Sequence, residues 1–202
     1  SEGTSTQIGT FSTGDTHSLS VLLNSDDAAT LDYSTAGGGS GTLSSNTFHV
    51  YLDGVKLGEY AFFLDPSDAG VAYNEGVADL GRVAFYQDTG SSGALIIDDL
   101  KISGISAGVG SINNVYSSLD FEADTVGEQP VVESAFYTPG TNGSVNGAVV
   151  IDADSTPVAN PLTGQSLYFY DLGTASGNST HFRYPFNGGD DVSELRVDFD
   201  FQ

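Results

Sequence analysis

Few residues in this sequence could carry out acid–base chemistry. His181, Arg183 and Tyr184 stand together in THFRYPF, and such groups could neutralise a carboxylate and move a proton. Glu194 and Asp198 are four residues apart, which places two carboxylates on one face of a strand, as glycoside hydrolysis requires. A single His-x-Arg is more often a surface pair, and the sequence contains no nucleophile elbow, phosphate-binding glycine loop or histidine cluster. We therefore expect no enzymatic activity.

The aromatic residues offer binding chemistry instead. In QSLYFYD, alternation puts Tyr168 and Tyr170 on one face of a strand and Phe169 on the other, so one set is core and the other exposed. Exposed rings of this kind could stack on the sugar rings of a polysaccharide, although Trp is absent and most aromatic residues in sandwiches pack in the core. The candidate sugar-binding residues are Tyr168, Tyr170, Arg183 and Tyr184.

Charge excludes two classes of partner. The chain has 5 Lys+Arg against 27 Asp+Glu, a formal net charge of −22, which repels nucleic acid and anionic membranes. No apolar run approaches the roughly 18 residues of a membrane span, so we expect no membrane insertion. Such acidity suits salty water and divalent cations, or simply solubility. The absence of Cys excludes disulfides, and a composition with 26 Gly is typical of a secreted or cell-surface bacterial or archaeal protein.

Short apolar runs broken by Gly, Asn, Asp and Ser predict an all-β fold, an antiparallel sandwich with little or no helix. TFHVYLDGVKLGEYAFF (47–63) predicts a type I′ hairpin around Asp53-Gly54. GRVAFYQDTGSSGALIIDDLKIS (81–103) predicts a second hairpin, with DTGSSG as its turn. Later strands are expected in SVNGAVVIDAD, QSLYFYDLG, THFRYPF and ELRVDFDFQ.

Three segments carry a resemblance to jelly-roll modules of the concanavalin-like, laminin-G-like and carbohydrate-binding type. IIDDLKIS resembles the last strand of these modules, LDFEADTVGEQP their first strand, and QSLYFYD a strand some tens of residues later. The hairpin around Asp53-Gly54 resembles one found in laminin-G-like domains. The resemblance implies a jelly roll. Glycosidases of this fold carry E-x-D-x-x-E in one strand, and SELRVDFDFQ lacks the third acid.

The order of these segments is permuted. Residues 1–104 resemble the C-terminal part of a jelly roll, residues 105–116 a linker, and residues 117–202 the N-terminal part. Three explanations remain open: a circular permutant whose ends meet where RVDFDFQ adjoins SEGTSTQIGTF, one period of a tandem array, or strand exchange with neighbouring copies. The alternation of Phe199 and Phe201 up to the terminus favours the last two together.

The resemblance also implies a structural calcium ion between the first and last strands, where carboxylate and carbonyl oxygens would supply its ligands. Because Asp98 and Asp99 are adjacent and point to opposite faces, we expect only one inward ligand from this pair, Asp99, acting with Glu122. Solvent-facing acids are the alternative. The candidate ligands are Glu122, Asp99, Asp98, Asp124 and Asp120.

Together these patterns predict a non-enzymatic, secreted structural module of an extracellular filament, sheath, matrix or long repetitive adhesin. Its expected partners are other copies of itself, and its expected cofactor is calcium. The alternative is a carbohydrate-binding module that accompanies a polysaccharide-degrading enzyme.

Overall fold

A computed structural model describes residues 9–26, 29–34, 40–61, 82–87, 93–105, 115–130, 136–138, 146–156, 158–172, 180–185, 192 and 194–202. These residues form strands, turns and bends, with no helix among them, so the chain belongs to the all-β class as predicted. The strands are β1 (His17–Asn24), β2 (Leu31–Ser34), β3 (Ser40–Leu43), β4 (Thr47–Leu52), β5 (Val55–Ala61), β6 (Arg82–Gln87), β7 (Gly93–Ser103), β8 (Val115–Leu119), β9 (Phe136–Thr138), β10 (Asn146–Ile151), β11 (Ser166–Asp171), β12 (Thr180–Pro185) and β13 (Glu194–Phe201).

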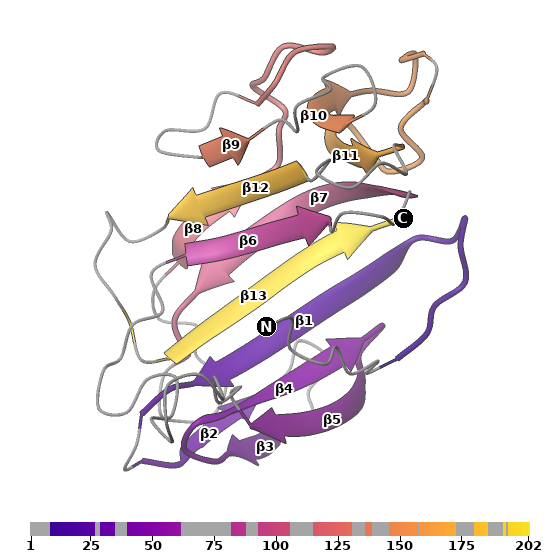
Figure 1. The fold of residues 1–202 in the computed structure, drawn as a ribbon. Coiled ribbons are helices and arrows are strands. Elements are labelled where there is room, and N and C mark those ends of the chain that lie inside the picture. The colour runs from indigo at the N-terminus through magenta and orange to yellow at the C-terminus, as the bar shows by residue number, and fades with distance from the viewer. Residues whose placement is uncertain are drawn as a thin grey trace.

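One large antiparallel sheet dominates the fold (Figure 1). Its strand order is β10-β11-β7-β13-β1-β4-β5. The long strand β7 pairs with β11 along its first half and with β8 along its second half, which makes this sheet eight-stranded. Beside it are a three-stranded sheet, β6-β12-β9, and the two-stranded hairpin β2-β3.

The large sheet is covered on both faces. On one face its apolar side chains meet the three-stranded sheet, where the rings of Phe85 on β6 and Phe199 on β13 lie edge to face with centroids 5.0 Å apart. On the other face the β2-β3 hairpin covers a second, smaller core that contains Leu22, Tyr33 and Leu43. We call these the inner face and the outer face. The arrangement is sandwich-like, and it is compatible with a jelly roll.

The hairpin between β4 and β5 has the predicted turn. Asp53 and Gly54 both adopt positive φ angles, 51° and 76°, as a type I′ turn requires. Inward-facing Val50 and Leu52 alternate with outward-facing His49, so local sequence fixes both the turn and the faces of these strands.

The second predicted hairpin, over residues 81–103, is wrong. Strand β6 pairs with β12 in the three-stranded sheet, whereas β7 pairs with β11, β8 and β13 in the large sheet. The chain therefore crosses from one layer to the other between these two strands. Both strands satisfy their backbone groups with partners that are distant in sequence, which a local pattern cannot reveal.

A β-bulge interrupts β7 at Asp99. The pairing with β13 steps from Asp198↔Lys101 to Asp200↔Asp98, and Asp99 adopts a φ of 49°. The extra residue resets the alternation of side chains along the strand. As a result Asp98 is 6% exposed, while Asp99 is exposed to solvent.

The C-terminal strand β13 lies inside the large sheet, between β7 and β1 of the same chain (Figure 1). Its register with β1 pairs Phe201 with His17. Gln202 exchanges two backbone hydrogen bonds with Ile96, at 3.0 and 3.1 Å, and its side-chain amide donates to the Gly14 carbonyl at 2.6 Å. Phe201 is only 5% exposed, so the alternating pattern at the end of the chain meets neighbouring strands on both sides within the chain.

Parts of the permuted organisation fall outside the described residues. Residues 1–8, which would follow Gln202 at the proposed junction of the two ends, are not described. Residues 106–114 of the predicted linker are not described either. The FEAD segment, expected in a first strand, forms a turn after β8, with Phe121 at a φ of 59°. Among the described residues there is no helix with the length and hydropathy needed to cross a membrane.

Candidate functional site

Tyr168 and Tyr170 form an aromatic pair on the outer face of the large sheet. Their neighbour Phe169 joins the core on the inner face, so alternation points both tyrosines the opposite way. The two rings are stacked, with centroids 4.9 Å apart and planes inclined by 20°. The Tyr170 hydroxyl lies close over Gly147, where a Cβ atom would come within 2.7 Å of it. The glycine thus leaves room for the ring to lie along the sheet.

The other two candidate sugar-binding residues belong to a different sheet. Arg183 and Tyr184 lie in β12, where their backbones pair with Ala84 and Val83 of β6, and their side chains lie outside the described residues. The tyrosine pair lies in β11 of the large sheet.

A pair of carboxylates lies near the tyrosine pair on the outer face. Asp98 and Asp200 are direct cross-strand partners, an arrangement that places like charges opposite one another. Burial raises the pKa of Asp98 to about 6, and the charges of Asp99 and Glu122 act in the same direction. Burial and nearby aspartates also raise the pKa of Asp200. This part of the sheet therefore carries unneutralised negative charge at neutral pH.

The expectation that Asp99 points inward is wrong, because the bulge buries Asp98 and exposes Asp99. Glu122 lies beside the 160–165 loop, where its Oε1 accepts a hydrogen bond from the Gln165 backbone at 2.8 Å. Asp120 accepts from the Glu122 backbone at 3.2 Å within the same turn, and the Asp124 backbone donates to the Phe121 carbonyl at 3.1 Å.

These acids do not converge on one point. Within the described ranges no group of three or more His, Asp or Glu side chains could hold a metal ion by itself. Asp98 and Glu122 are the two candidate ligands whose charges interact across different elements. Any calcium ion at this place would depend on backbone carbonyl oxygens for most of its six to eight ligands.

The outer face also contains a buried polar network that the sequence did not predict. His49 on β4 is 1% exposed, and its Nε2 lies 2.7 Å from Glu59 Oε2 on β5. Its Nδ1 lies 2.6 Å from the hydroxyl of Tyr33 on β2, which in turn lies 2.5 Å from the hydroxyl of Tyr51. The hydrogen bond from His49 lowers the pKa of Glu59. An acid, an imidazole and a hydroxyl in series resemble a proton relay, but Tyr33 is only 4% exposed.

A second network joins β13 to its neighbours. The Arg196 guanidinium donates to both carboxylate oxygens of Asp198, at 2.7 and 2.9 Å, and also to the Ser34 carbonyl at 3.4 Å. The Ser20 hydroxyl on β1 donates to the same carboxylate. Because Arg196 is only 7% exposed, this two-pronged ion pair is better shielded from water than a surface pair.

The histidine at the start of β1 is tied to the β4–β5 turn. His17 Nδ1 lies 2.8 Å from Asp53 Oδ2, and its Nε2 lies 3.1 Å from the Ser12 carbonyl. Both ring nitrogens thus face acceptors, and the hydrogen bond to Asp53 raises the pKa of His17. The same bond lowers the pKa of Asp53, whose Oδ1 also accepts from the Ser18 backbone at 2.9 Å.

No family model, curated protein or solved structure matches this chain.

The three networks share one property. Each joins side chains of different strands or turns, so each couples the positions of neighbouring strands. By contrast, the tyrosine pair lies on the outer face close to the buried Asp98 and the half-buried Asp200. The first arrangement stabilises a sheet, and the second can contact a ligand or a partner.

Proposed function

We propose that this chain is a non-enzymatic, secreted structural module, related to concanavalin-like and laminin-G-like jelly rolls, that builds an extracellular filament, sheath, matrix or long repetitive adhesin. The observation that carries the proposal is the use of His17, His49 and Arg196 in hydrogen-bonded networks between strands. Side chains that elsewhere serve as catalytic bases and anion-binding groups are here committed to fixing one strand against the next.

Assembly with other copies would use an edge of the large sheet. The main path of the sheet ends at β10 and β5, and β8, which pairs only with β7 among the described strands, is a third edge. The edge of β10 that faces away from β11 is partly covered. There the Gly127 backbone donates a hydrogen bond to the Val150 carbonyl at 2.8 Å, and the Val150 backbone donates to the Glu128 carbonyl at 2.9 Å. Among the described residues no further strand pairs with β5, and Val55 on this strand is 64% exposed. An unpaired edge can add a strand from another copy.

The experiment is a concentration series with matched variants. Light scattering and negative-stain microscopy should show association of the wild-type chain as its concentration rises. Val55→Lys should weaken association at least tenfold, because a charged residue on an edge strand opposes strand addition. Leu172→Lys, at a position that is 55% exposed just after the end of β11, should leave association unchanged. A chain that stays monomeric at millimolar concentration would contradict the proposal.

The proposed module would bind calcium at one site, between Asp98 and Glu122. Burial is the main cause of the raised pKa of Asp98, and the charge of Glu122 adds to it; a calcium ion between these two carboxylates would stabilise both charged forms, with carbonyl oxygens supplying the remaining ligands. Calcium should then raise the melting temperature, and Asp98→Asn should remove this response. An identical melting temperature in calcium and in excess chelator would exclude the ion.

The tyrosine pair supports carbohydrate binding as a second candidate function. Two stacked rings on the outer face form a platform for sugar rings. Affinity electrophoresis in neutral polysaccharides tests it: Tyr168→Ala and Tyr170→Ala should each weaken binding about tenfold, or 1.4 kcal/mol, while Tyr60→Ala on β5 should not. Equal retardation of all three variants would refute a role for the pair.

A further inference from the structure

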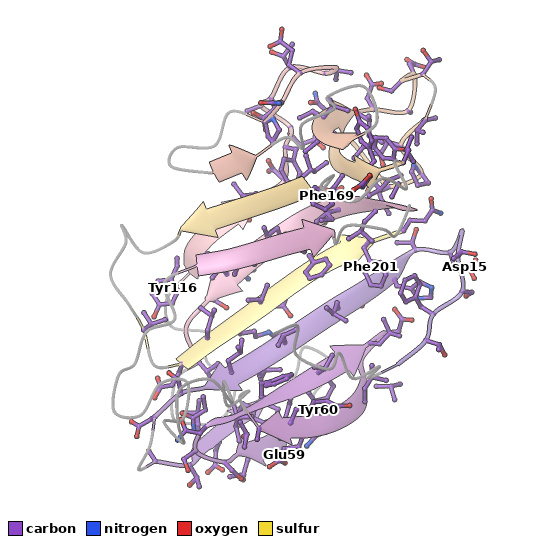
Figure 2. All side chains as sticks on the ribbon, viewed as in Figure 1. Asp15, Glu59, Tyr60, Tyr116, Phe169 and Phe201 are labelled. Carbon is purple, nitrogen blue, oxygen red and sulfur yellow. The ribbon has the colours of Figure 1, made fainter. Side chains whose placement is uncertain are left out.

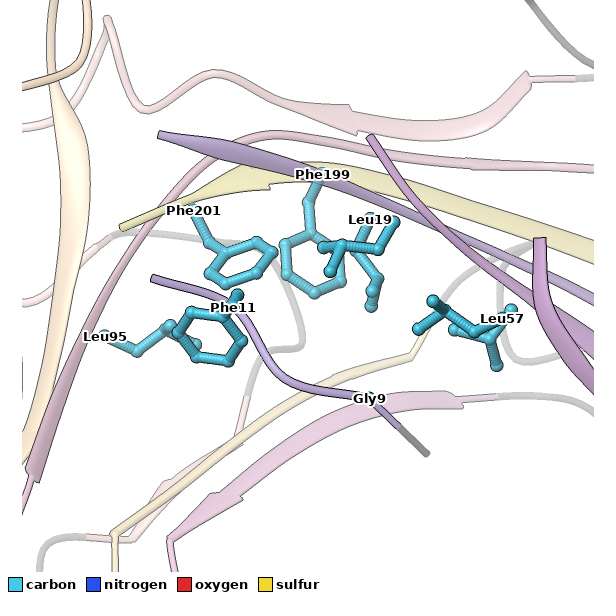
Figure 3. Close-up of a pocket in the computed structure, with 9 residues that line it drawn as sticks. Gly9, Phe11, Leu19, Leu57, Leu95, Phe199 and Phe201 are labelled. Atoms are coloured by element: carbon cyan, nitrogen blue, oxygen red, sulfur yellow. The ribbon is translucent and has the colours of Figure 1, made fainter. Parts of the chain in front are cut away.

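An elongated apolar cavity lies on the inner face of the large sheet, the face opposite the tyrosine pair (Figure 3). Its volume is about 370 Å³. Five adjacent strands contribute to its floor, from Leu57 on β5 at one end to Leu95 on β7 at the other. The segment that precedes β1 forms a further wall through Gly9 and Phe11.

The described lining of this cavity is hydrocarbon. It consists of Leu, Val and Phe side chains and one glycine, none of which has a side-chain hydrogen-bonding group. Large apolar cavities are poor sites for water, and a cavity of roughly 150 Å³ already accepts benzene. The volume here falls within the range of roughly 300–1,000 Å³ that is typical of small-molecule sites. The chemistry and the size therefore fit an apolar molecule larger than a single ring.

The length and width of the cavity limit which apolar molecules fit it. Five adjacent strands at a spacing of about 4.8 Å span about 19 Å from the first to the last. A volume of about 370 Å³ spread over that length gives a mean cross-section of roughly 20 Å². A space of this length and mean width fits one extended hydrocarbon chain. An unbranched alkyl chain that lies across the strands would fill the space.

The charge of the chain further limits which molecules could bind in this cavity. The chain has a net charge of −22, and no cation lines the cavity among the described residues. A basic group, His17, lies near one end, where its ring is 5.6 Å from the rings of both Phe11 and Phe201. This imidazole is already bonded to Asp53 at 2.8 Å. A fatty-acid carboxylate would find no partner and would meet a repulsive field.

From these observations we propose that the cavity binds a single unbranched, uncharged alkyl chain, such as that of a long-chain alcohol. This site is independent of the proposed structural function. It lies on the face of the sheet opposite the tyrosine pair, and its formation requires no second copy.

The test uses the neutral fluorescent probe N-phenyl-1-naphthylamine and its displacement by 1-dodecanol. The wild-type chain should enhance the fluorescence of the probe, and 1-dodecanol should displace it at least tenfold better than dodecanoate at pH 8. Leu57→Trp, which fills one end of the cavity, should weaken dodecanol binding at least tenfold. The matched control Leu172→Trp, at a surface position that is 55% exposed, should bind as the wild type does.

A second variant keeps the proposal testable if Leu57→Trp fails to fold. Leu95→Phe fills the opposite end of the cavity and should shift the preferred alcohol from dodecanol to octanol, because the cavity becomes shorter. Circular dichroism and thermal melting identify any variant that fails to fold. Absence of probe binding to the wild type, equal displacement by dodecanoate, or binding by folded Leu57→Trp equal to that by Leu172→Trp would each overturn the proposal.

Discussion

Replacing Phe201 by Ala tests whether the chain supplies its own central strand. The Phe201 side chain lies at the end of β13 (Figure 2). It belongs to the inner face, and its ring lies beside the rings of Phe11 and His17. It is 5% exposed, and it meets Phe11 edge to face at 5.0 Å and Phe199 at 5.9 Å. Its aromatic contacts therefore come from two segments that precede it by almost the whole length of the chain and from its own strand.

The expected cost is large because little of this ring is in water. Burying a phenylalanine removes about 150–250 Å² from solvent, and aromatic pairs add roughly 0.5–1.5 kcal/mol each. Phe→Ala substitutions in cores cost about 3–5 kcal/mol, and we expect Phe201→Ala to fall in this range. For a domain of this size such a loss corresponds to a decrease in melting temperature of roughly 6–20 °C.

Urea denaturation at two protein concentrations provides the assay. Phe11→Ala is the matched control, because Phe11 touches the same ring but is 50% exposed, and it should cost less than about 1.5 kcal/mol. Below the concentrations at which copies of the chain associate, the unfolding midpoint of the wild type should not depend on protein concentration, since the strand is supplied in cis. A loss below about 1 kcal/mol for Phe201→Ala, or a midpoint that rises with concentration, would refute this reasoning.

Three further predictions concern the buried polar groups. Because burial raises the pKa of Asp98 to about 6, the contribution of Asp98 to folding stability should fall as pH rises from about 4 to 6. Asp98→Asn in chelator should therefore stabilise the chain by up to about 3 kcal/mol at pH 8 in thermal melts. The His17–Asp53 pair should stabilise fully between about pH 3.8 and 6.5, and it should lose its effect as pH rises through the raised pKa of His17 or falls through the lowered pKa of Asp53. Asp53→Asn should lower the pKa of His17 in an NMR titration, and an unchanged titration would contradict the assignment. Tyr33→Phe leaves His49 and Tyr51 without their shared hydroxyl partner and should cost about 1–3 kcal/mol in urea, whereas Tyr60→Phe should be neutral; equal effects would argue against the network.

The sequence predicts those features of the fold that depend on neighbouring residues. The all-β class follows from short alternating runs, and the β4–β5 hairpin follows from Asp53-Gly54, because two successive positive φ angles favour these residue types. The two faces of QSLYFYD follow from alternation, which correctly separates Tyr168 and Tyr170 from Phe169. Each of these predictions needs information from only a few consecutive positions.

What the sequence does not predict depends on partners that are distant in the chain. The partners of β6 and β7 lie in different sheets, and nothing within residues 81–103 specifies this. The bulge at Asp99 reverses the expected roles of the two aspartates, and it depends on the register with β13. The His49 network joins three strands, so the only signal in the sequence was a histidine on the outward face of the first hairpin.

The pairing of β1 with β13 has a mechanical consequence. The two strands are antiparallel, and the start of β1 at His17 lies beside the end of β13 at Phe201. A tension that enters through the segment before His17 and leaves through the residues after Phe201 would therefore peel the ladder open one hydrogen bond at a time, instead of shearing all of its bonds together. Peeling needs little force, and the released chain could extend by roughly 600 Å. In a filament or an adhesin, a module with this geometry would act as an extensible element that yields early under load.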